Sequence, residues 1–188
     1  YISMGPLDLQ NYFFEHRKQL ADAIKDSKEI INKVSKEFEK ISGRKYDLIE
    51  KYKMDDTDVA VVVLNSTAGT AKDVVDNLRA NGIKAGLVKP RAFRPLPVDE
   101  LAESIKNVKA LAIMDKADSC NGFSGPLFSE VASALYSKNI HVPAVNYIYG
   151  LGGRDVKTSD IESVFENLSR IAKDGKAEKT TYYLGVRD

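Results

Sequence analysis

The sequence has few of the residues on which most metal and redox chemistry depends. It contains one cysteine, two histidines and no tryptophan among 188 residues. A single cysteine, Cys120, excludes an internal disulfide and a four-cysteine iron–sulfur cluster within this chain. His16 and His141 lie far apart, with no carboxylate at metal-ligand spacing. We therefore expect no metal site in this chain.

The sequence also lacks an excess of either charge and lacks long hydrophobic runs. Its 28 Lys and Arg residues balance 27 Asp and Glu residues, which gives a net charge of +1. Such a balance offers no electrostatic footprint for nucleic acid or for an acidic membrane. No apolar run has the length of a membrane span, and no signal peptide is recognisable. We expect a cytoplasmic protein with neither nucleic-acid nor membrane partners.

The hydrophobic pattern divides the chain into two predicted parts, and the first, residues 1–54, is a charged helical arm. Asp8 is the predicted N-cap of its helix, and Gly43 is the predicted stop. A second short amphipathic piece follows around Tyr46, Ile49 and Tyr52. Apolar residues three and four positions apart, or their sum, form one face, which Ser27 interrupts: Leu20, Ile24, Ile31, Val34, Phe38 and Ile41. We expect this stripe to pack on a neighbouring domain or partner subunit rather than to form an independent coiled coil.

The second part, residues 55–188, has the pattern of an α/β domain. We expect strands at 59–64, 84–90, 110–115 and 142–150, with a further edge strand near the C-terminus. Helices are expected between them at 70–80, 97–106 and 126–137. Ser159 and Glu162 form a predicted capping box for a last helix that runs to Ile171. This alternation predicts a mainly parallel sheet of about five strands with helices on both faces.

Four turns follow the predicted strands, at the edge where open α/β sheets bind ligands. The turn STAGT (66–70) presents hydroxyls and amides beside a helix N-terminus, which is an arrangement that can bind an anion. It matches neither G-x-x-x-x-G-K-[ST] nor G-x-G-x-x-G. We therefore favour a capped strand–helix turn over a dinucleotide site.

The other turns add arginines to the same predicted rim. PRAFRPLP (90–97) holds Arg91 and Arg94, which suit carboxylate or phosphate contacts but pair equally well with the protein's own carboxylates. GLGGRD (150–155) adds Arg154, and its glycines predict positive φ. The candidate anion-binding or interface residues are Ser66, Thr67, Gly69, Thr70, Arg91, Arg94 and Arg154.

The fourth turn, KADSCNGFSGP (116–126), offers a hydrolase as a less favoured alternative. It would use Asp115, Asp118 and Cys120, but neither histidine is an obvious partner for the thiol. No acid–base pair, triad or metal set is complete, so we predict no catalytic residue in this chain.

Six segments, in this order, carry a resemblance to a known family. They are GPLDLQNYFFEHRKQ (5–19), GRKYDLIEKY (43–52), NSTAGTAKDVVDNLR (65–79), GLVKPRAFRPLP (86–97), FSGPLFSEVASAL (123–135) and YGLGGRD (149–155). Together they resemble the α chain of pyruvate:ferredoxin oxidoreductase. The resemblance covers the C-terminal part of that chain, a transketolase C-terminal-like domain with the arm before it. The pyruvate branch looks closer than the 2-oxoglutarate branch, and other 2-oxoacids remain open.

The resemblance implies a parent enzyme that converts pyruvate, coenzyme A and oxidised ferredoxin to acetyl-CoA, CO2 and reduced ferredoxin. That enzyme uses thiamine diphosphate, Mg and [4Fe-4S] clusters. This chain lacks the G-D-G diphosphate motif and the cluster cysteines, so the resemblance implies an organisational domain that binds none of these cofactors alone. Its implied partners are the remainder of the α chain and the other subunits, with docking of coenzyme A at the rim as an option. The alternative is a free-standing small-molecule or nucleotide-binding domain.

Overall fold

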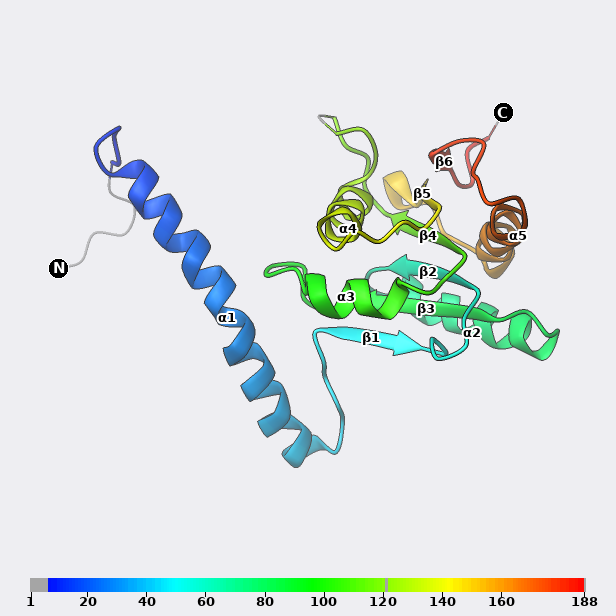
Figure 1. Cartoon of the computed structure of the whole chain (residues 1–188), viewed down its shortest axis with the longest axis horizontal. Coiled ribbons are helices and arrows are strands. Elements are labelled where there is room, and N and C mark those ends of the chain that lie inside the picture. Colours follow the sequence, from blue (N-terminus) through cyan, green and yellow to red (C-terminus); the bar gives the residue numbers. More distant parts are fainter. Residues whose placement is uncertain (1–6, 121, 188) are drawn as a thin grey trace.

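The computed structural model describes residues 7–120 and 122–187, so Gly5, Pro6 and Asn121 of the segments quoted above lie outside the described residues. One long helix, α1 (Phe13–Ser42), stands to one side of an α/β unit that begins at residue 49 (Figure 1). We call α1 the arm and residues 49–187 the body. No helix within the described ranges is long and apolar enough to cross a membrane.

The arm ends as the sequence predicts but begins later. Gly43 adopts a left-handed conformation with φ of 68°, and its N–H donates to the carbonyl of Glu39 at 2.8 Å. The prediction of Asp8 as N-cap is wrong, because the helix begins at Phe13 with Tyr12 in the N-cap position. Asp8 precedes a tight turn, and its carboxylate contacts the ring of His16 at 2.5 Å instead. None of the described residues of α1 is buried.

The body contains one sheet, which has six strands within the described residues, in the order β1-β3-β2-β4-β5-β6. The parallel strands are β2 (Val59–Val63), β3 (Ala85–Pro90), β4 (Ala110–Asp115), β5 (Ala144–Ile148) and β6 (Thr181–Tyr183). They confirm the predicted mainly parallel sheet, including its C-terminal edge strand.

The sheet has one strand more than expected, β1 (Ile49–Tyr52), which is antiparallel to β3. The sequence assigned this segment to an amphipathic piece of the arm, because Tyr46, Ile49 and Tyr52 are three residues apart. In so short a segment, the spacing of apolar residues does not distinguish a helix from a strand. Its pairing with β3 joins residues before the predicted boundary at 54/55 to the sheet.

Two helices cover each face of the sheet, as predicted (Figure 1). α2 (Thr67–Ala80) and α5 (Thr158–Asp174) pack on one face, and α3 (Val98–Ile105) and α4 (Pro126–Ser137) pack on the other. All five residues of β2 are buried: Val59, Val61 and Val63 face the first pair, while Ala60 and Val62 face the second.

The start of α5 differs in detail from the prediction. The capping contact is made by Asp160, whose carboxylate accepts the N–H of Lys157 at 2.8 Å. Ser159 and Glu162 do not form the predicted capping box, because the N-cap is Lys157, two residues before Ser159. The acidic residue three positions after the N-cap is then Asp160 rather than Glu162.

Candidate functional site

A cavity lies where the connections of the sheet change direction. β2 pairs with β3 on one side and with β4 on the other, so the turns that follow β2 and β4 diverge between these strands. A cavity of about 360 Å³ opens there, lined by Leu64–Thr67 after β2, Met114–Ala117 after β4 and Tyr149 after β5. Ligands of open α/β sheets bind at this kind of switch point.

Two of the predicted STAGT residues, Ser66 and Thr67, line this cavity. The buried hydroxyl of Thr67 accepts a hydrogen bond from the hydroxyl of Tyr149 at 2.8 Å. Burial raises the pKa of Tyr149, and the bond to Thr67 acts in the opposite direction. Tyr149 therefore remains a neutral donor at neutral pH and ties the turn after β5 to the first residue of α2.

The STAGT turn is not capped by its serine. Ser66 occupies the N-cap position but has helical φ and ψ, and its side chain makes no capping hydrogen bond. The N–H of Gly69 donates to the carbonyl of Ser66 at 2.8 Å, and Asn65 takes a left-handed φ of 58°. Gly69 is exposed and Thr70 is half-buried. The backbone, and not a side-chain cap from Ser66, thus closes this strand–helix turn.

The opposite wall of the cavity is built around the buried carboxylate of Asp115. It accepts the N–H of Leu127 at 2.7 Å and that of Phe128 at 3.1 Å. Both lie in the first turn of α4, where N–H groups have no partner within the helix. Burial raises the pKa of Asp115, while these two bonds and one from Asn146 act in the opposite direction. Asp115 therefore caps α4 from the end of β4.

Asn146 is an important residue that the sequence analysis missed. It is fully buried in β5, donates to the carbonyl of Ile113 at 2.9 Å and to Asp115 at 2.8 Å, and accepts the N–H of Gly125 at 2.8 Å. A Cβ on Gly125 would lie 2.4 Å from the Asp115 carboxyl carbon. A single amide inside the apolar run VPAVNYIYG was the available signal, since buried polar groups require partners.

Arg91 contacts β1 and the residues just before it. Its guanidinium contacts Glu50 at 2.6 Å, donates to the carbonyl of Lys45 at 3.3 Å and lies over the ring of Tyr46 at 4.9 Å. Glu50 also accepts a short hydrogen bond from Lys72. Lys72 and then Arg91 hold the pKa of Glu50 below its usual value, although burial opposes them.

Arg94 and Arg154 are paired with other elements. Arg94 contacts Glu130 of α4 at 2.5 Å and lies 4.6 Å from the centre of the Phe93 ring. Arg154 donates to the carbonyl of Gly185. The positive φ predicted in its turn is confirmed, since Gly150, Gly152 and Gly153 have φ of 67°, 66° and 80°. The three predicted arginines are thus held against three different elements instead of converging on one ligand.

The residues of the hydrolase alternative are engaged separately. Asp118 accepts hydrogen bonds from the hydroxyl of Tyr183 at 2.9 Å and from the N–H of Ser119 at 2.8 Å. Cys120 is exposed, and Asp115 caps α4. Across residues 7–120 and 122–187, no group of three or more His, Cys, Asp or Glu residues is placed to hold a metal ion. The one cysteine of the chain does not fit a cluster held by four cysteines.

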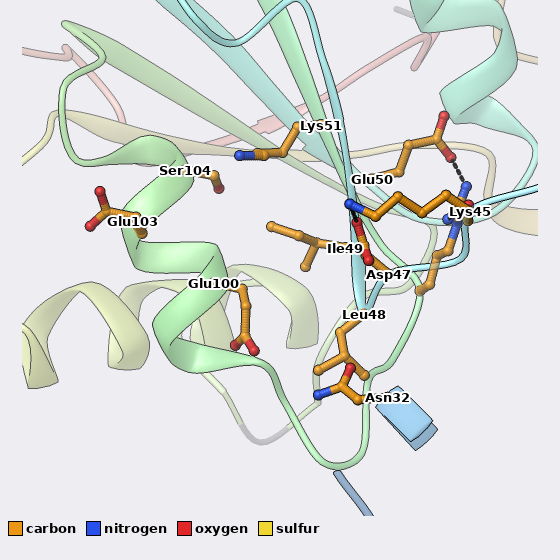
Figure 2. A pocket seen from close by; sticks show the side chains of 11 residues that line it. Asn32, Lys45, Asp47, Leu48, Ile49, Glu50, Lys51, Glu100, Glu103 and Ser104 are labelled. Atoms are coloured by element: carbon orange, nitrogen blue, oxygen red, sulfur yellow. Dashed lines mark hydrogen bonds and ion pairs between the residues drawn. The ribbon is translucent and has the colours of Figure 1, made fainter. Parts of the chain in front are cut away.

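A second, larger cavity separates the arm from the body. It has a volume of about 680 Å³ and is lined by β1 with the residues before it, by Glu100, Glu103 and Ser104 of α3, and by Asn32 of α1. Figure 2 shows Ile49 and Lys51 of β1 extending towards α3 across this space, whereas Glu50 points to the other side of the strand. An ion pair between Lys28 and Glu100, at 2.9 Å, links the arm to the body. Charged side chains of both signs line this space together with the apolar Leu48 and Ile49.

The layers and the strand order define the class of the body. Counted alone, the parallel strands follow the order 2-1-3-4-5 of doubly wound α/β domains, and β1 adds an antiparallel edge. A solved structure titled "Split gene transketolase, inactive beta4 tetramer" has the same kind of fold. It aligns with a TM-score of 0.54 and 19% identity, over 69% of this chain and 44% of that one.

The sequence narrows the class to one family. Residues 57–161, more than half of the chain, match the family model described as pyruvate:ferredoxin oxidoreductase core domain II. The chain belongs to this family, which confirms the resemblance carried by the six segments.

Two curated relatives match almost the whole chain. The pyruvate synthase subunit PorA of Thermotoga maritima is 40% identical over 190 residues, which cover 100% of this chain and 47% of the relative. The ketoisovalerate oxidoreductase subunit VorA of Pyrococcus abyssi is 38% identical, over 95% of this chain and 45% of the relative. This chain therefore spans about half the length of the curated relatives it matches.

Proposed function

We propose that this chain is an organisational domain of a thiamine-diphosphate-dependent pyruvate:ferredoxin oxidoreductase. One observation carries the proposal: the similarity to PorA extends over 100% of this chain, the arm included, yet covers 47% of that subunit. The parent reaction would convert pyruvate, coenzyme A and oxidised ferredoxin to acetyl-CoA, CO2 and reduced ferredoxin. The chain alone would be inactive, and its role would be to join the other parts of the enzyme.

The choice of pyruvate rests on the segments GPLDL (5–9) and GRKY (43–46), which flank the arm in the sequence. Identities of 40% to a pyruvate synthase subunit and 38% to a ketoisovalerate oxidoreductase subunit support a 2-oxoacid in general. We propose pyruvate as the substrate of the parent enzyme and the cytoplasm as its location. Thiamine diphosphate, Mg and [4Fe-4S] clusters would be bound by other parts of the complex.

In this proposal, the arginines of the predicted rim act mainly at an interface. Because Arg91 and Arg94 already pair with Glu50 and Glu130, a phosphate would have to displace a carboxylate to reach either guanidinium. We propose that these pairs shape a surface for a neighbouring part of the enzyme, and that docking of coenzyme A is the weaker of the two roles predicted from sequence.

The test is reconstitution of the oxidoreductase with and without this chain. Pyruvate- and coenzyme A-dependent reduction of a viologen dye should need both this chain and the remaining parts. Replacing Arg91 and Arg94 together by alanine should weaken assembly while leaving the coenzyme A concentration for half-maximal rate within about twofold. Full activity without the chain, or activity of the chain alone, would refute the proposed function.

A second candidate, the free-standing small-molecule-binding domain, is favoured by the cavity at the switch point. It requires a stable monomer that binds a ligand saturably without any partner. Lining substitutions such as Ser66→Leu should then abolish binding by the isolated chain, whereas the organisational role requires no ligand of the isolated chain at all.

A further inference from the structure

The exposed apolar stripe of α1 has the spacing of a coiled-coil seam. Starting at Phe13, alternating steps of four and three residues lead to Ile41, and only Arg17 and Ser27 on this path are not apolar. This 3.5-residue repeat keeps one narrow line of side chains facing a single partner helix. We call it the seam, and its residues are Phe13, Arg17, Leu20, Ile24, Ser27, Ile31, Val34, Phe38 and Ile41.

The seam is largely open to solvent in this chain. Val34 is 55% exposed and Ile41 is 83% exposed, while Leu20 and Phe38 are each 47% exposed. Apolar side chains in one continuous line, left at this exposure over a 30-residue helix, mark a contact surface rather than isolated surface residues.

The body leaves most of the seam uncovered, because its contacts with α1 through Lys28 and Asn32 fall on a neighbouring flank of the helix. Four polar residues of this flank, Lys28, Asn32, Ser35 and Glu39, are half-buried, and so are Ser27 and Ile31 of the seam. Lys28 pairs with Glu100, and Asn32 lines the cavity beside β1. At 3.6 residues per turn, these four lie roughly a quarter turn from the centre of the seam. The described residues therefore cover the seam only in part, at Ser27, at Ile31 and at Phe38, whose ring lies 5.7 Å from that of Tyr46. The rest of the seam remains available for another partner.

Three observations indicate what covers the seam. Its narrow repeat suits one helix at a shallow crossing angle better than a broad apolar surface. A parallel second copy would stack Arg17 on Arg17 and Ser27 on Ser27, which disfavours that form of self-pairing. The similarity to PorA includes the arm, and about half of that subunit lies outside the matched region.

We propose that the seam binds one amphipathic helix from the half of the subunit that this chain does not include. This inference rests on the proposed function. The partner helix carries its own apolar repeat, an acidic residue opposite Arg17 and a large apolar residue opposite Ser27. The seam would then fasten the body to the rest of the subunit while Lys28 and Glu100 set the arm's angle.

The test compares two exposed aliphatic residues of α1, one on the seam and one beside it. Val34 is on the seam and is 55% exposed, and Ile30 is outside the seam and is 62% exposed. This chain, carrying Val34→Asp or Ile30→Asp, is mixed with the separately produced remainder of the subunit, and the dissociation constant is measured by calorimetry. Val34→Asp should weaken binding by about 100-fold and Ile30→Asp by less than about fivefold, because only the first buries a carboxylate.

Each of the other possible outcomes would contradict a different part of the proposal. Equal losses for the two variants would show that the contact is a broad face and not a single-helix seam. Binding that neither variant weakens would place the partner elsewhere on the chain. A tight dimer of the isolated chain that Val34→Asp dissociates, with no effect on the remainder, would assign the seam to a second copy. If the unmodified parts neither bind nor reconstitute activity, the proposed function itself fails.

A control separates binding from folding. Both variants, measured alone in urea, should unfold at the midpoint of the unmodified chain, since neither residue is buried. A lower midpoint for Val34→Asp alone would mean that the seam packs within this chain, which would overturn the proposal.

Discussion

The arm and the elements of the body are all amphipathic, but only the body buries its apolar side chains against other parts of the chain. Phe165 of α5 and Leu111 of β4 are at most 1% exposed, and the body buries apolar side chains on both faces of its sheet. The arm buries none of its 30 helical residues. Hydrophobic period therefore predicts that an element exists, but not which surface covers it.

This difference has an energetic consequence. Helices gain most of their stability from packing an apolar face, and an isolated helix in water is marginal. The elements of the body cover one another, whereas the arm meets the body through polar residues and the Lys28–Glu100 pair. We expect the two regions to respond to the same kind of substitution in very different ways.

The largest difference should come from truncating apolar side chains in the two regions. Phe165→Ala should lower the free energy of unfolding by about 3–5 kcal/mol, because it leaves a cavity between α5 and the sheet. Val34→Ala in the arm should change it by less than about 0.5 kcal/mol. Urea denaturation followed by circular dichroism measures both. Similar losses for the two variants would show that the arm belongs to the folding unit of the body.

The next largest effect should come from the buried polar contacts at the switch point. Asn146→Ala leaves the N–H of Gly125 and one oxygen of Asp115 without a bond they now make. The free energy of unfolding should fall by about 2–4 kcal/mol, which is more than the loss of one exposed hydrogen bond. Thermal unfolding of this variant beside Asn77→Ala on exposed α2 surface gives the comparison, and equal melting temperatures would contradict this account of Asn146.

A smaller effect on stability, which depends on pH, should come from the ion pairs of Glu50 at the edge of the body nearest the arm. The folded-state pKa of Glu50 is lowered, chiefly by Lys72, so its ion pairs stabilise the fold above the usual pKa near 4.5. That contribution is lost as the pH falls below this value towards the lowered folded-state pKa. Glu50→Gln should cost about 1 kcal/mol at pH 7 and almost nothing at pH 3. A cost that stays constant between these two pH values would rule out the ion pairs as its cause.

The smallest effect on stability should come from the contact between the two regions. Lys28→Ala removes the ion pair to Glu100, which is partly exposed, and should change the free energy of unfolding by at most about 0.5 kcal/mol. Distances between spin labels on α1 and α3 should nevertheless spread, because this pair helps to fix the arm. An unchanged distance distribution would show that other contacts orient α1.

The same contrast explains what could be predicted from the sequence. Buried strands such as VAVVV gave clear patterns, and α4, which begins with Pro126, was predicted at its observed bounds. β1 was missed because a segment of four residues is too short for its hydrophobic period to distinguish a strand from a helix. Asp8 failed as a cap because the helix begins only at Phe13, and the carboxylate of Asp8 contacts His16 instead.

The candidate site was predicted less well than the fold, for a physical reason. The sequence placed the four turns at one edge of the sheet, and Ser66 and Thr67 do line a cavity there. It could not show that Arg91, Arg94 and Arg154 each have a partner inside the chain, because those partners lie on distant segments. Asn146 and Tyr149 gain their roles only when β5 is placed beside β4 and α2.

The central claim is that the body buries its apolar side chains within this chain, whereas the arm needs a partner to cover its seam. Hydrogen exchange of backbone amides tests this claim most directly. In the isolated chain, amides of β2, β4 and β5 should be protected for hours, and those of α1 should exchange within seconds. On addition of the remainder of the subunit, protection should appear along the seam of α1 while the body changes little. If α1 in the isolated chain is already as protected as β4, the arm has its partner within this chain and the account is wrong.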